Sequence, residues 1–368
     1  MQTEGKVRTL AADCDVHNDL TSTASLVPYL PDHWVEHFLQ SEFKGPSDNY
    51  YPPIQFLDRG QVAARSGGGD GDPDSGQRVK ALDPAAMRAY LDHTGADVAL
   101  LNCCYAVDSL KNPDQAVALA RAVNDWQIAE WLDVDSRFRA SLVVPIQVPS
   151  LAIEEIERVG DHPGFVQVML PARSAHPYGS RLYHELWATL VRHDLVAGIH
   201  YGGAPGNPST AVGWPSYYFE EYVGMALVFA TQVVSLVTEG VFQRFPEMRV
   251  TLSESGCTWL PSHMWRFNKD WKNLRSLTPW LKRSPAEYIR EHFRLTVEPF
   301  DDPDQAAGLE RLADRLGSDE MLMYSTDFPH QSAEPQAQRL AGTLPEGFAS
   351  KVLWENARDW YRLDTPRH

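Results

Sequence analysis

Carboxylate and imidazole side chains recur in this sequence directly after short apolar runs. The first run is followed by Asp15 and His17, and a later run ends at His200, which precedes Tyr201 and two glycines. An Asp-x-His pair at a strand end puts a carboxylate and an imidazole on one side of an extended backbone, because side chains alternate with a period of two. Oxygen and nitrogen ligands that face one point could hold a divalent metal ion.

Two further runs end in acidic residues. Glu254 opens a Glu-Ser-Gly sequence, and Asp327 opens Asp-Phe-Pro-His, which ends at His330. A divalent ion held by imidazoles and carboxylates keeps one position open, where it lowers the pKa of a bound water toward ~7 or polarises a carbonyl. A nearby carboxylate that is not a ligand, such as Glu254, could then move protons. Asp327 is a candidate both for metal ligation and for proton transfer.

Each of these residues also has an ordinary structural explanation. His200 could be a core histidine with satisfied hydrogen bonds, and Asp327 could cap the turn that follows it. Glu254 could orient a ligand histidine instead of transferring protons. His330 could orient Asp327 or pack in the proline turn. The polar residues after other runs, Asn102 among them, are expected to satisfy loop backbone.

The elements that must position these residues follow a regular alternation from residue 83 onward. Asp83 and Pro84 supply an N-cap and a first helical residue, and Gly95 ends that helix. Apolar runs and helical segments then alternate to the end of the chain, which favours a parallel barrel over an open sheet. In such barrels active sites lie at the carboxyl ends of the strands. The eight expected strands are the opening run at 7–14 and the segments 98–101, 140–144, 165–170, 196–200, 249–253, 293–297 and 321–325.

Two long connections interrupt this pattern, after the first and the fifth strand. Residues 18–82 lack sustained periodicity and contain a Gly/Asp run at 66–73, so we expect a flexible insertion or a lid over the strand ends. This run lacks the Lys and Ser/Thr of a phosphate-binding loop, which argues against nucleotide binding. Residues 201–216 form a second irregular loop.

Several side chains near these strand ends are candidates for contact with a substrate. Arginines in the insertion and after the fourth strand could clamp an anion, and aromatic residues after the fifth strand could wall a pocket for a ring. The same arginines could be ordinary surface residues, and the aromatics could form a subunit contact. The candidates are Arg59, Arg173, His176, Tyr201, Trp214 and His330.

Composition narrows the class of protein. The 368 residues fit one domain spanning 1–368, since a single α/β barrel of this size can bury a large core. The net charge of −16 argues against nucleic acid or an anionic membrane as a partner. We find no signal-peptide pattern and no window that approaches a membrane span, and the four cysteines are too few for a disulfide framework. A soluble cytoplasmic protein with reduced thiols is therefore expected.

The ordered set of strand-end motifs resembles the amidohydrolase-2 family, the branch of the amidohydrolase superfamily related to aminocarboxymuconate semialdehyde decarboxylase. The motifs are Asp-x-Asp-x-His, His-Tyr-Gly-Gly, Glu-Ser-Gly, Asp-Phe-Pro-His and the late Glu355-Asn356-Ala357. The resemblance implies a distorted (β/α)8 TIM barrel, one catalytic zinc or manganese ion, and often a homodimer. It places the metal ligands at Asp15, His17, His200 and Asp327.

One departure from the family bears on the reaction. Characterised decarboxylases of the family carry a His after strand six, where this chain has Glu254, and a carboxylate there differs in charge and proton affinity. The leading hypothesis is therefore a metal-dependent hydrolase that activates water, with Glu254 as the proton carrier. The second is a metal-dependent nonoxidative decarboxylase of an unsaturated or aromatic acid. The third is a barrel that only binds a ligand.

Overall fold

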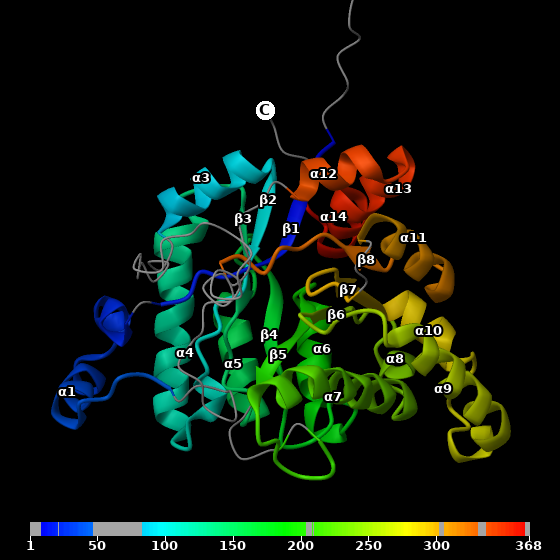
Figure 1. The fold of residues 1–368 in the computed structure, drawn as a ribbon. Coiled ribbons are helices and arrows are strands. Elements are labelled where there is room, and N and C mark those ends of the chain that lie inside the picture. The colour runs from blue at the N-terminus through cyan, green and yellow to red at the C-terminus, as the bar shows by residue number, and fades with distance from the viewer. Residues whose placement is uncertain are drawn as a thin grey trace, which may run out of the picture.

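The computed structural model describes residues 9–20, 22–46, 83–203, 208, 210–301, 305–329 and 336–364. In this part of the chain eight parallel strands pair in sequence order, each with the next, and form a nearly closed barrel (Figure 1). The strands are β1 Ala12–Val16, β2 Val98–Leu101, β3 Phe138–Leu142, β4 Phe165–Arg173, β5 Val196–Gly203, β6 Val250–Ser253, β7 Phe293–Thr296 and β8 Leu322–Met323. The predicted TIM-barrel fold is confirmed.

Backbone contacts between the last strand and the first complete the ring. Cys14 N donates to Tyr324 O at 2.9 Å, and Asp327 N donates to Asp15 O at 2.9 Å. These bonds bring the carboxyl ends of β1 and β8, which are far apart in the sequence, side by side. Residues that follow the two strands therefore share one edge of the barrel.

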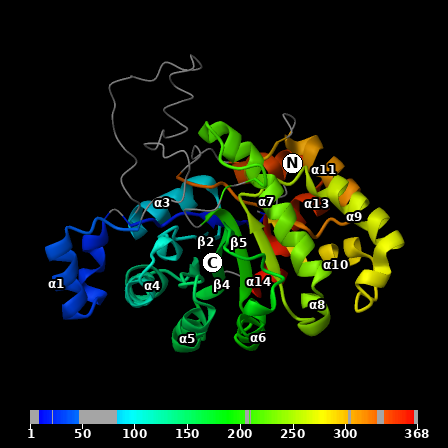
Figure 2. The same cartoon turned by 90° about the horizontal axis from the view of Figure 1, so that it is seen from below.

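Helices cover the outside of the strands, as Figures 1 and 2 show from two directions. The helix predicted after residue 83 is confirmed: the Asp83 side chain accepts from Ala86 N, and Gly95 ends the helix with a φ of 77°. The helices are α1 Asp32–Ser41, α3 Pro84–Thr94, α4 Pro113–Gln127, α5 Pro149–Val159, α6 His184–Arg192, α7 Tyr218–Thr238, α8 Val241–Arg244, α9 Leu260–Leu274, α10 Pro285–His292, α11 Gln305–Leu316, α12 Gln336–Thr343, α13 Glu346–Ser350 and α14 Asn356–Tyr361.

The first strand begins later than the apolar run at 7–14 predicts, so that Asp13 and Asp15 lie inside β1. A buried carboxylate is tolerated in a strand when hydrogen bonds satisfy it. Asp13 accepts from Thr326 N at 3.0 Å and from Tyr90 Oη at 2.8 Å. These partners come from α3 and from the segment after β8. The periodicity of the sequence does not show that these segments contact β1.

The long insertion is only partly within the described residues. A short 3-10 helix at Thr23–Tyr29 and α1 occupy its beginning, although the sequence showed no periodicity there. Leu26 and Phe38 pack in a cluster with Leu119 and Val123 of α4. Figures 1 and 2 show α1 on the outer side of α4. The predicted lid or flexible insertion spans residues 18–82, and its part at 47–82 lies outside the described residues.

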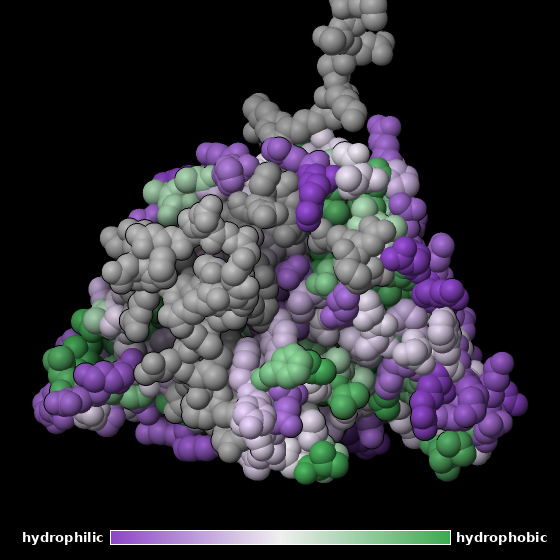
Figure 3. Space-filling model, viewed as in Figure 1, coloured by the Kyte–Doolittle hydropathy of each residue, from purple (hydrophilic) through white to green (hydrophobic). Residues whose placement is uncertain are grey.

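Helix α7 differs from the expectation, drawn from composition, that no segment approaches the length and apolar character of a membrane span. By length and composition alone it could cross a membrane, with 44% of its most apolar window buried inside the protein. Met225, Phe229 and Val233 lie in the main core cluster, which accounts for much of this apolar character. The opposite side of the helix exposes Phe219, and apolar patches interrupt the hydrophilic surface at lower centre in Figure 3, where Figure 1 places α7.

A line of buried polar groups crosses the barrel interior from α14 toward the carboxyl ends of the strands. Tyr361 Oη donates to Gln167 Oε1 at 3.0 Å, and Gln167 Nε2 donates to Ser141 Oγ at 2.9 Å. Ser141 Oγ donates to Asn102 Oδ1 at 2.6 Å, and Asn102 Nδ2 donates to Asp15 Oδ1 at 2.7 Å. The line ends at Asp15, which the sequence analysis singled out as a candidate metal ligand.

Candidate functional site

Four of the predicted site residues meet at the carboxyl edge of the barrel. His17 Nε2 lies 3.0 Å from Asp327 Oδ1 and 3.8 Å from Asp15 Oδ1. His200 Nε2, from the carboxyl half of β5, lies 3.3 Å from the same Asp15 oxygen. The four side chains are buried and come from β1, the residue directly after it, β5 and the segment after β8. We call these residues the strand-end cluster.

Hydrogen bonds on the far side of each imidazole set the orientation of the rings. His17 Nδ1 lies 2.9 Å from Asn102 O, and His200 Nδ1 lies 3.0 Å from Tyr201 O. Because a carbonyl oxygen only accepts, each Nδ1 carries a hydrogen. A neutral ring then has its lone pair on Nε2, which faces the carboxylates, and this is the arrangement of histidines that bind metals.

The donor set of the strand-end cluster suits a divalent ion. Two carboxylates and two imidazole nitrogens are ligands that zinc and manganese both accept. Asp15 Oδ2 is buried and has no hydrogen-bond partner among the described residues. A buried carboxylate oxygen without a donor is costly unless a cation compensates it, so the residues fit the ion that the family implies.

The charges of the cluster shift the proton affinity of its histidines. Burial lowers the pKa of His200, but Cys104 and Asp15 raise it more, so that the pKa is about 10. For His17 burial also lowers the pKa, and the opposing effects of Cys104 and Asp327 raise it well above its ordinary value. A concentration of negative charge thus surrounds both rings, and it would attract a cation.

Two acidic residues of the site have unusual backbone conformations. Glu254, directly after β6, has a φ of 55°, and Asp327 has a φ of 57°. Residues other than glycine rarely adopt such left-handed values, and those that do often belong to functional sites. The Glu254 side chain is buried and accepts from Tyr222 Oη at 3.3 Å, while Thr296 Oγ1 accepts from Glu254 N at 3.1 Å.

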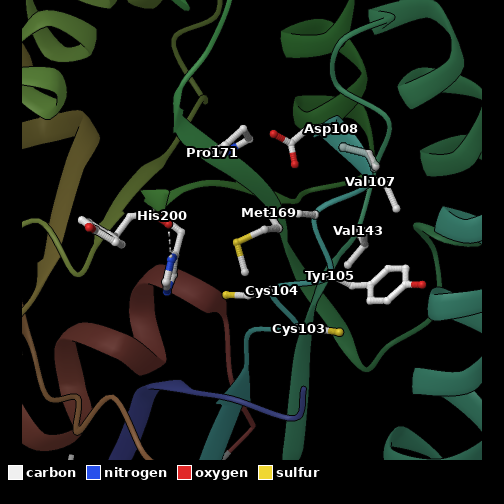
Figure 4. Close-up of a pocket in the computed structure, with 12 residues that line it drawn as sticks. Cys103, Cys104, Tyr105, Val107, Asp108, Val143, Met169, Pro171 and His200 are labelled. Carbon is white, nitrogen blue, oxygen red and sulfur yellow. Dashed lines mark hydrogen bonds between the residues drawn. The ribbon is translucent and has the colours of Figure 1, made fainter. Parts of the chain in front are cut away.

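A pocket adjoins the cluster and shares His200 with it. It contains about 430 Å³ of empty space, part of which is open to solvent. Figure 4 shows His200 and Cys104 on one side, with Met169 and Val143 among the apolar residues nearby. Mostly apolar walls with a few polar groups are typical of small-molecule sites.

The predicted substrate-binding residues are scattered in the structure. Tyr201 is buried and lines the pocket. Arg173 is buried in an ion pair with Glu221 of α7, with Nη2 and Oε1 3.1 Å apart, so a carboxylate of the protein already compensates its charge. His176 and Trp214 are exposed. Arg59 and His330 lie outside the described residues.

Two contributors to the site were not singled out from the sequence. Asn102, which was expected to serve loop backbone, contacts both Asp15 and His17. Cys104 Sγ lies 3.5 Å from His17 Nδ1. Asn102 directly follows β2 and Cys104 comes two residues later, so inspection of every strand end for any polar or sulfur side chain could have found them.

Comparisons with known proteins agree with this geometry. The amidohydrolase family profile matches residues 12–363. Gamma-resorcylate decarboxylase of Polaromonas sp. (strain JS666) is 26% identical over 318 residues, which cover 78% of this chain and 90% of that protein. The structure of 5-carboxyvanillate decarboxylase LigW from Sphingomonas paucimobilis aligns with a TM-score of 0.71 at 21% identity, covering 97% of this chain and all (100%) of that one.

A further solved structure carries a metal. It is 5-carboxyvanillate decarboxylase from Novosphingobium aromaticivorans, complexed with manganese and 4-hydroxy-3-methoxy-5-nitrobenzoic acid. It aligns with a TM-score of 0.69 at 19% identity and covers 98% of each chain. The three proteins are decarboxylases, so the leading expectation of a water-activating hydrolase is wrong. Glu254 in place of a family histidine favours hydrolysis when the sequence is considered alone, but that single difference does not determine the reaction.

Proposed function

This chain is an enzyme of the amidohydrolase superfamily and belongs to its amidohydrolase family, and from that premise we propose that it is a metal-dependent nonoxidative decarboxylase of an aromatic carboxylic acid. The substrate class we propose is a benzoate with a hydroxyl group beside the carboxylate. The related decarboxylases act on gamma-resorcylate and 5-carboxyvanillate, and this is the feature that those acids share.

One observation carries the proposal: His200 belongs both to the strand-end cluster and to the wall of the pocket. A small aromatic acid could place its ring against apolar residues such as Val143 and Met169 while its oxygen atoms approach the cluster. The described pocket residues include no lysine or arginine, and Arg173 is paired with Glu221. The anionic end of the substrate would therefore depend on a cation held by the cluster.

The reaction needs one proton at the ring and releases one molecule of carbon dioxide. The ring carbon that bears the carboxylate takes up a proton, the bond to the carboxylate carbon breaks, and its electron pair restores the ring. No oxidant takes part. Asp15, His17, His200 and Asp327 would hold the ion, which supplies a positive charge that binds the substrate oxygens.

The protein's own residues would deliver the proton. Glu254 is buried after β6, and its carboxyl receives a hydrogen bond from Tyr222. We assign it the role of proton donor to the ring carbon, since a positioned carboxylic acid acts as a general acid. The apolar pocket wall would exclude water from the ring and so favour its protonation by the protein.

The test is release of carbon dioxide by the purified full-length protein from a panel of aromatic acids. The panel contains 2,6-dihydroxybenzoate, 5-carboxyvanillate, 2-hydroxybenzoate, and 4-hydroxybenzoate as the isomer without an adjacent hydroxyl. We expect carbon dioxide and the corresponding phenol from one or more acids with an adjacent hydroxyl, loss of activity with a chelator, and recovery with zinc or manganese. Absence of carbon dioxide from every acid after metal reconstitution would contradict the proposal.

A further inference from the structure

Cys104 lies against the strand-end cluster. Of the four cysteines it is the exposed one, while Cys14, Cys103 and Cys257 are buried. The Cys104 sulfur is 3.5 Å from His17 Nδ1, the ring nitrogen that faces Asn102 O. One ligand atom each from His17, Cys104 and His200 lie within 4.8 Å of one another. The backbone N of Cys104 donates to Asp19 Oδ1 at 2.9 Å, which holds this loop beside β1.

The 4.8 Å limit on the three ligand atoms is close to the spacing of ligands in a metal site. Ligand atoms around a tetrahedral zinc ion lie about 3.3 to 3.7 Å apart when the bonds are about 2.0 Å to nitrogen and about 2.3 Å to sulfur. The three atoms would have to approach by up to about an ångström on binding. Cys104 is the exposed member of the trio, so its side chain can make most of that movement.

A second observation points to a cation at the same place. Asp15 Oδ1 is 3.3 Å from His200 Nε2, while Asp15 Oδ2 is buried without a hydrogen-bond partner among the described residues. Cys104 and His200 also line the same pocket, and Figure 4 shows the Cys104 sulfur beside the His200 ring. The sulfur therefore borders both the candidate ligands and the space for a substrate.

We propose that the Cys104 thiolate is a ligand of the ion held by the strand-end cluster, and that it makes this site prefer zinc over manganese. Thiolate is a soft ligand that favours zinc, whereas carboxylates and imidazoles alone also suit manganese. The thiol proton passes to solvent when the ion binds, and no oxidation or reduction occurs. The inference rests on the metal-dependent part of the proposed function and not on the reaction.

The first test compares metal binding by the wild-type protein, Cys104→Ser and Cys104→Ala, with Cys103→Ala as the control that removes the neighbouring buried thiol. Metal-free full-length protein is titrated with cobalt(II) and, separately, equilibrated with equal zinc and manganese before its metal content is measured. The wild type and the control should show a sulfur-to-cobalt charge-transfer band, and both Cys104 variants should lack it. The preference for zinc over manganese should fall by about tenfold or more in these variants.

The second test needs no substitution and so does not depend on the folding of a variant. Iodoacetamide should alkylate Cys104 in the metal-free wild-type protein, as mass spectrometry can determine. Stoichiometric zinc should protect Cys104 strongly. Alkylation that is unaffected by zinc, or the same cobalt spectrum with and without the Cys104 thiol, would overturn the assignment. Because neither measurement involves turnover, carbon dioxide release from the acid panel judges the proposed function separately.

Discussion

Asn102 donates from Nδ2 to Asp15 Oδ1 at 2.7 Å, and this bond holds the carboxylate against the two imidazoles of the strand-end cluster. The backbone oxygen of Asn102 accepts from His17 Nδ1 at 2.9 Å, so one residue positions two members of the cluster. Through Ser141 and Gln167 the same side chain is linked to Tyr361 of the last helix. The cluster is thus supported from the barrel interior.

The proposed ligands can be tested by substitution. Asp15→Ala and His200→Ala should each reduce bound metal well below one ion per chain, because each removes a donor that faces the shared point. Metal content after dialysis measures this, with circular dichroism to establish folding. His176→Ala serves as a matched control, since that histidine is exposed on another strand end. Folded variants that both keep stoichiometric metal would remove Asp15 and His200 from the ligand set.

Removal of the Asn102 side chain should weaken metal binding without removing a ligand. Asn102→Ala leaves Asp15 Oδ1 without its donor, and losses of this kind reduce metal affinity by roughly 10- to 100-fold. Competition with a chromophoric chelator measures the affinity. Asn112→Ala is the control, because Asn112 caps α4 and has no contact with the cluster. Equal affinities in Asn102→Ala and the wild type would show that Asn102 does not position Asp15.

Substitution of Glu254, the proposed proton donor, should reduce turnover and leave metal binding unchanged. Glu254→Gln keeps the shape of the side chain but cannot supply the proton, so kcat for decarboxylation should fall by roughly 10²- to 10⁴-fold. Metal content should remain near that of the wild type, since Glu254 is not among the proposed ligands. A variant with unchanged kcat would assign the proton to another group. Loss of metal together with activity would instead place Glu254 in the ligand set.

Tyr361→Phe should affect stability more than chemistry. The substitution removes a buried hydroxyl and leaves Gln167 Oε1 without this donor, at a cost of about 1–3 kcal/mol in the free energy of unfolding. Denaturant unfolding measures the loss, and Tyr29→Phe, which removes a surface hydrogen bond to Glu130, should change it far less. If both variants lose the same small amount, the interior line of hydrogen bonds does not contribute to stability.

His292 should make stability depend on pH. Burial lowers the pKa of this histidine, which packs on Phe242 and bonds to Met248 O through Nδ1. As the pH falls through the ordinary histidine value of about 6.5, the unfolded chain takes up a proton that the folded protein resists. Stability is therefore lost toward acid pH and present above that value.

The comparison is between the wild type and His292→Gln, by thermal unfolding from about pH 5 to about pH 8 in the presence of a chelator. The difference in melting temperature between neutral and acid pH should be smaller in His292→Gln. Because His17 and His200 are present in both proteins, their contributions cancel. Parallel curves for the two proteins would show that His292 does not contribute to the pH dependence.

The barrel and four of its site residues could be predicted because the signals are local. Apolar runs alternate with helical segments, and Asp15, His17, His200 and Asp327 directly follow or end such runs. Contacts between segments that lie far apart in the sequence could not be predicted from such local patterns. Glu221 compensates Arg173 from α7, some fifty positions later in the chain, and no spacing rule connects them.

The role of a residue was harder to predict than its location. Asn102 was correctly placed at a strand end, but its contacts to Asp15 and His17 arise only when β1 and β2 pair. The left-handed conformations of Glu254 and Asp327 depend on the turns after β6 and β8 and have no counterpart in residue type. The reaction was the least accessible property, because the same donor set serves hydrolases and decarboxylases.

The left-handed backbone at Glu254 and Asp327 limits which amino acids these two positions tolerate. Valine, isoleucine and threonine, whose branched β-carbons crowd this conformation, would strain both turns before any effect on chemistry appeared. Asparagine and glycine fit the backbone readily. In a saturation library at either position, many variants would be inactive because they misfold. The amide analogues, asparagine for Asp327 and glutamine for Glu254, remove the acid and preserve the turn.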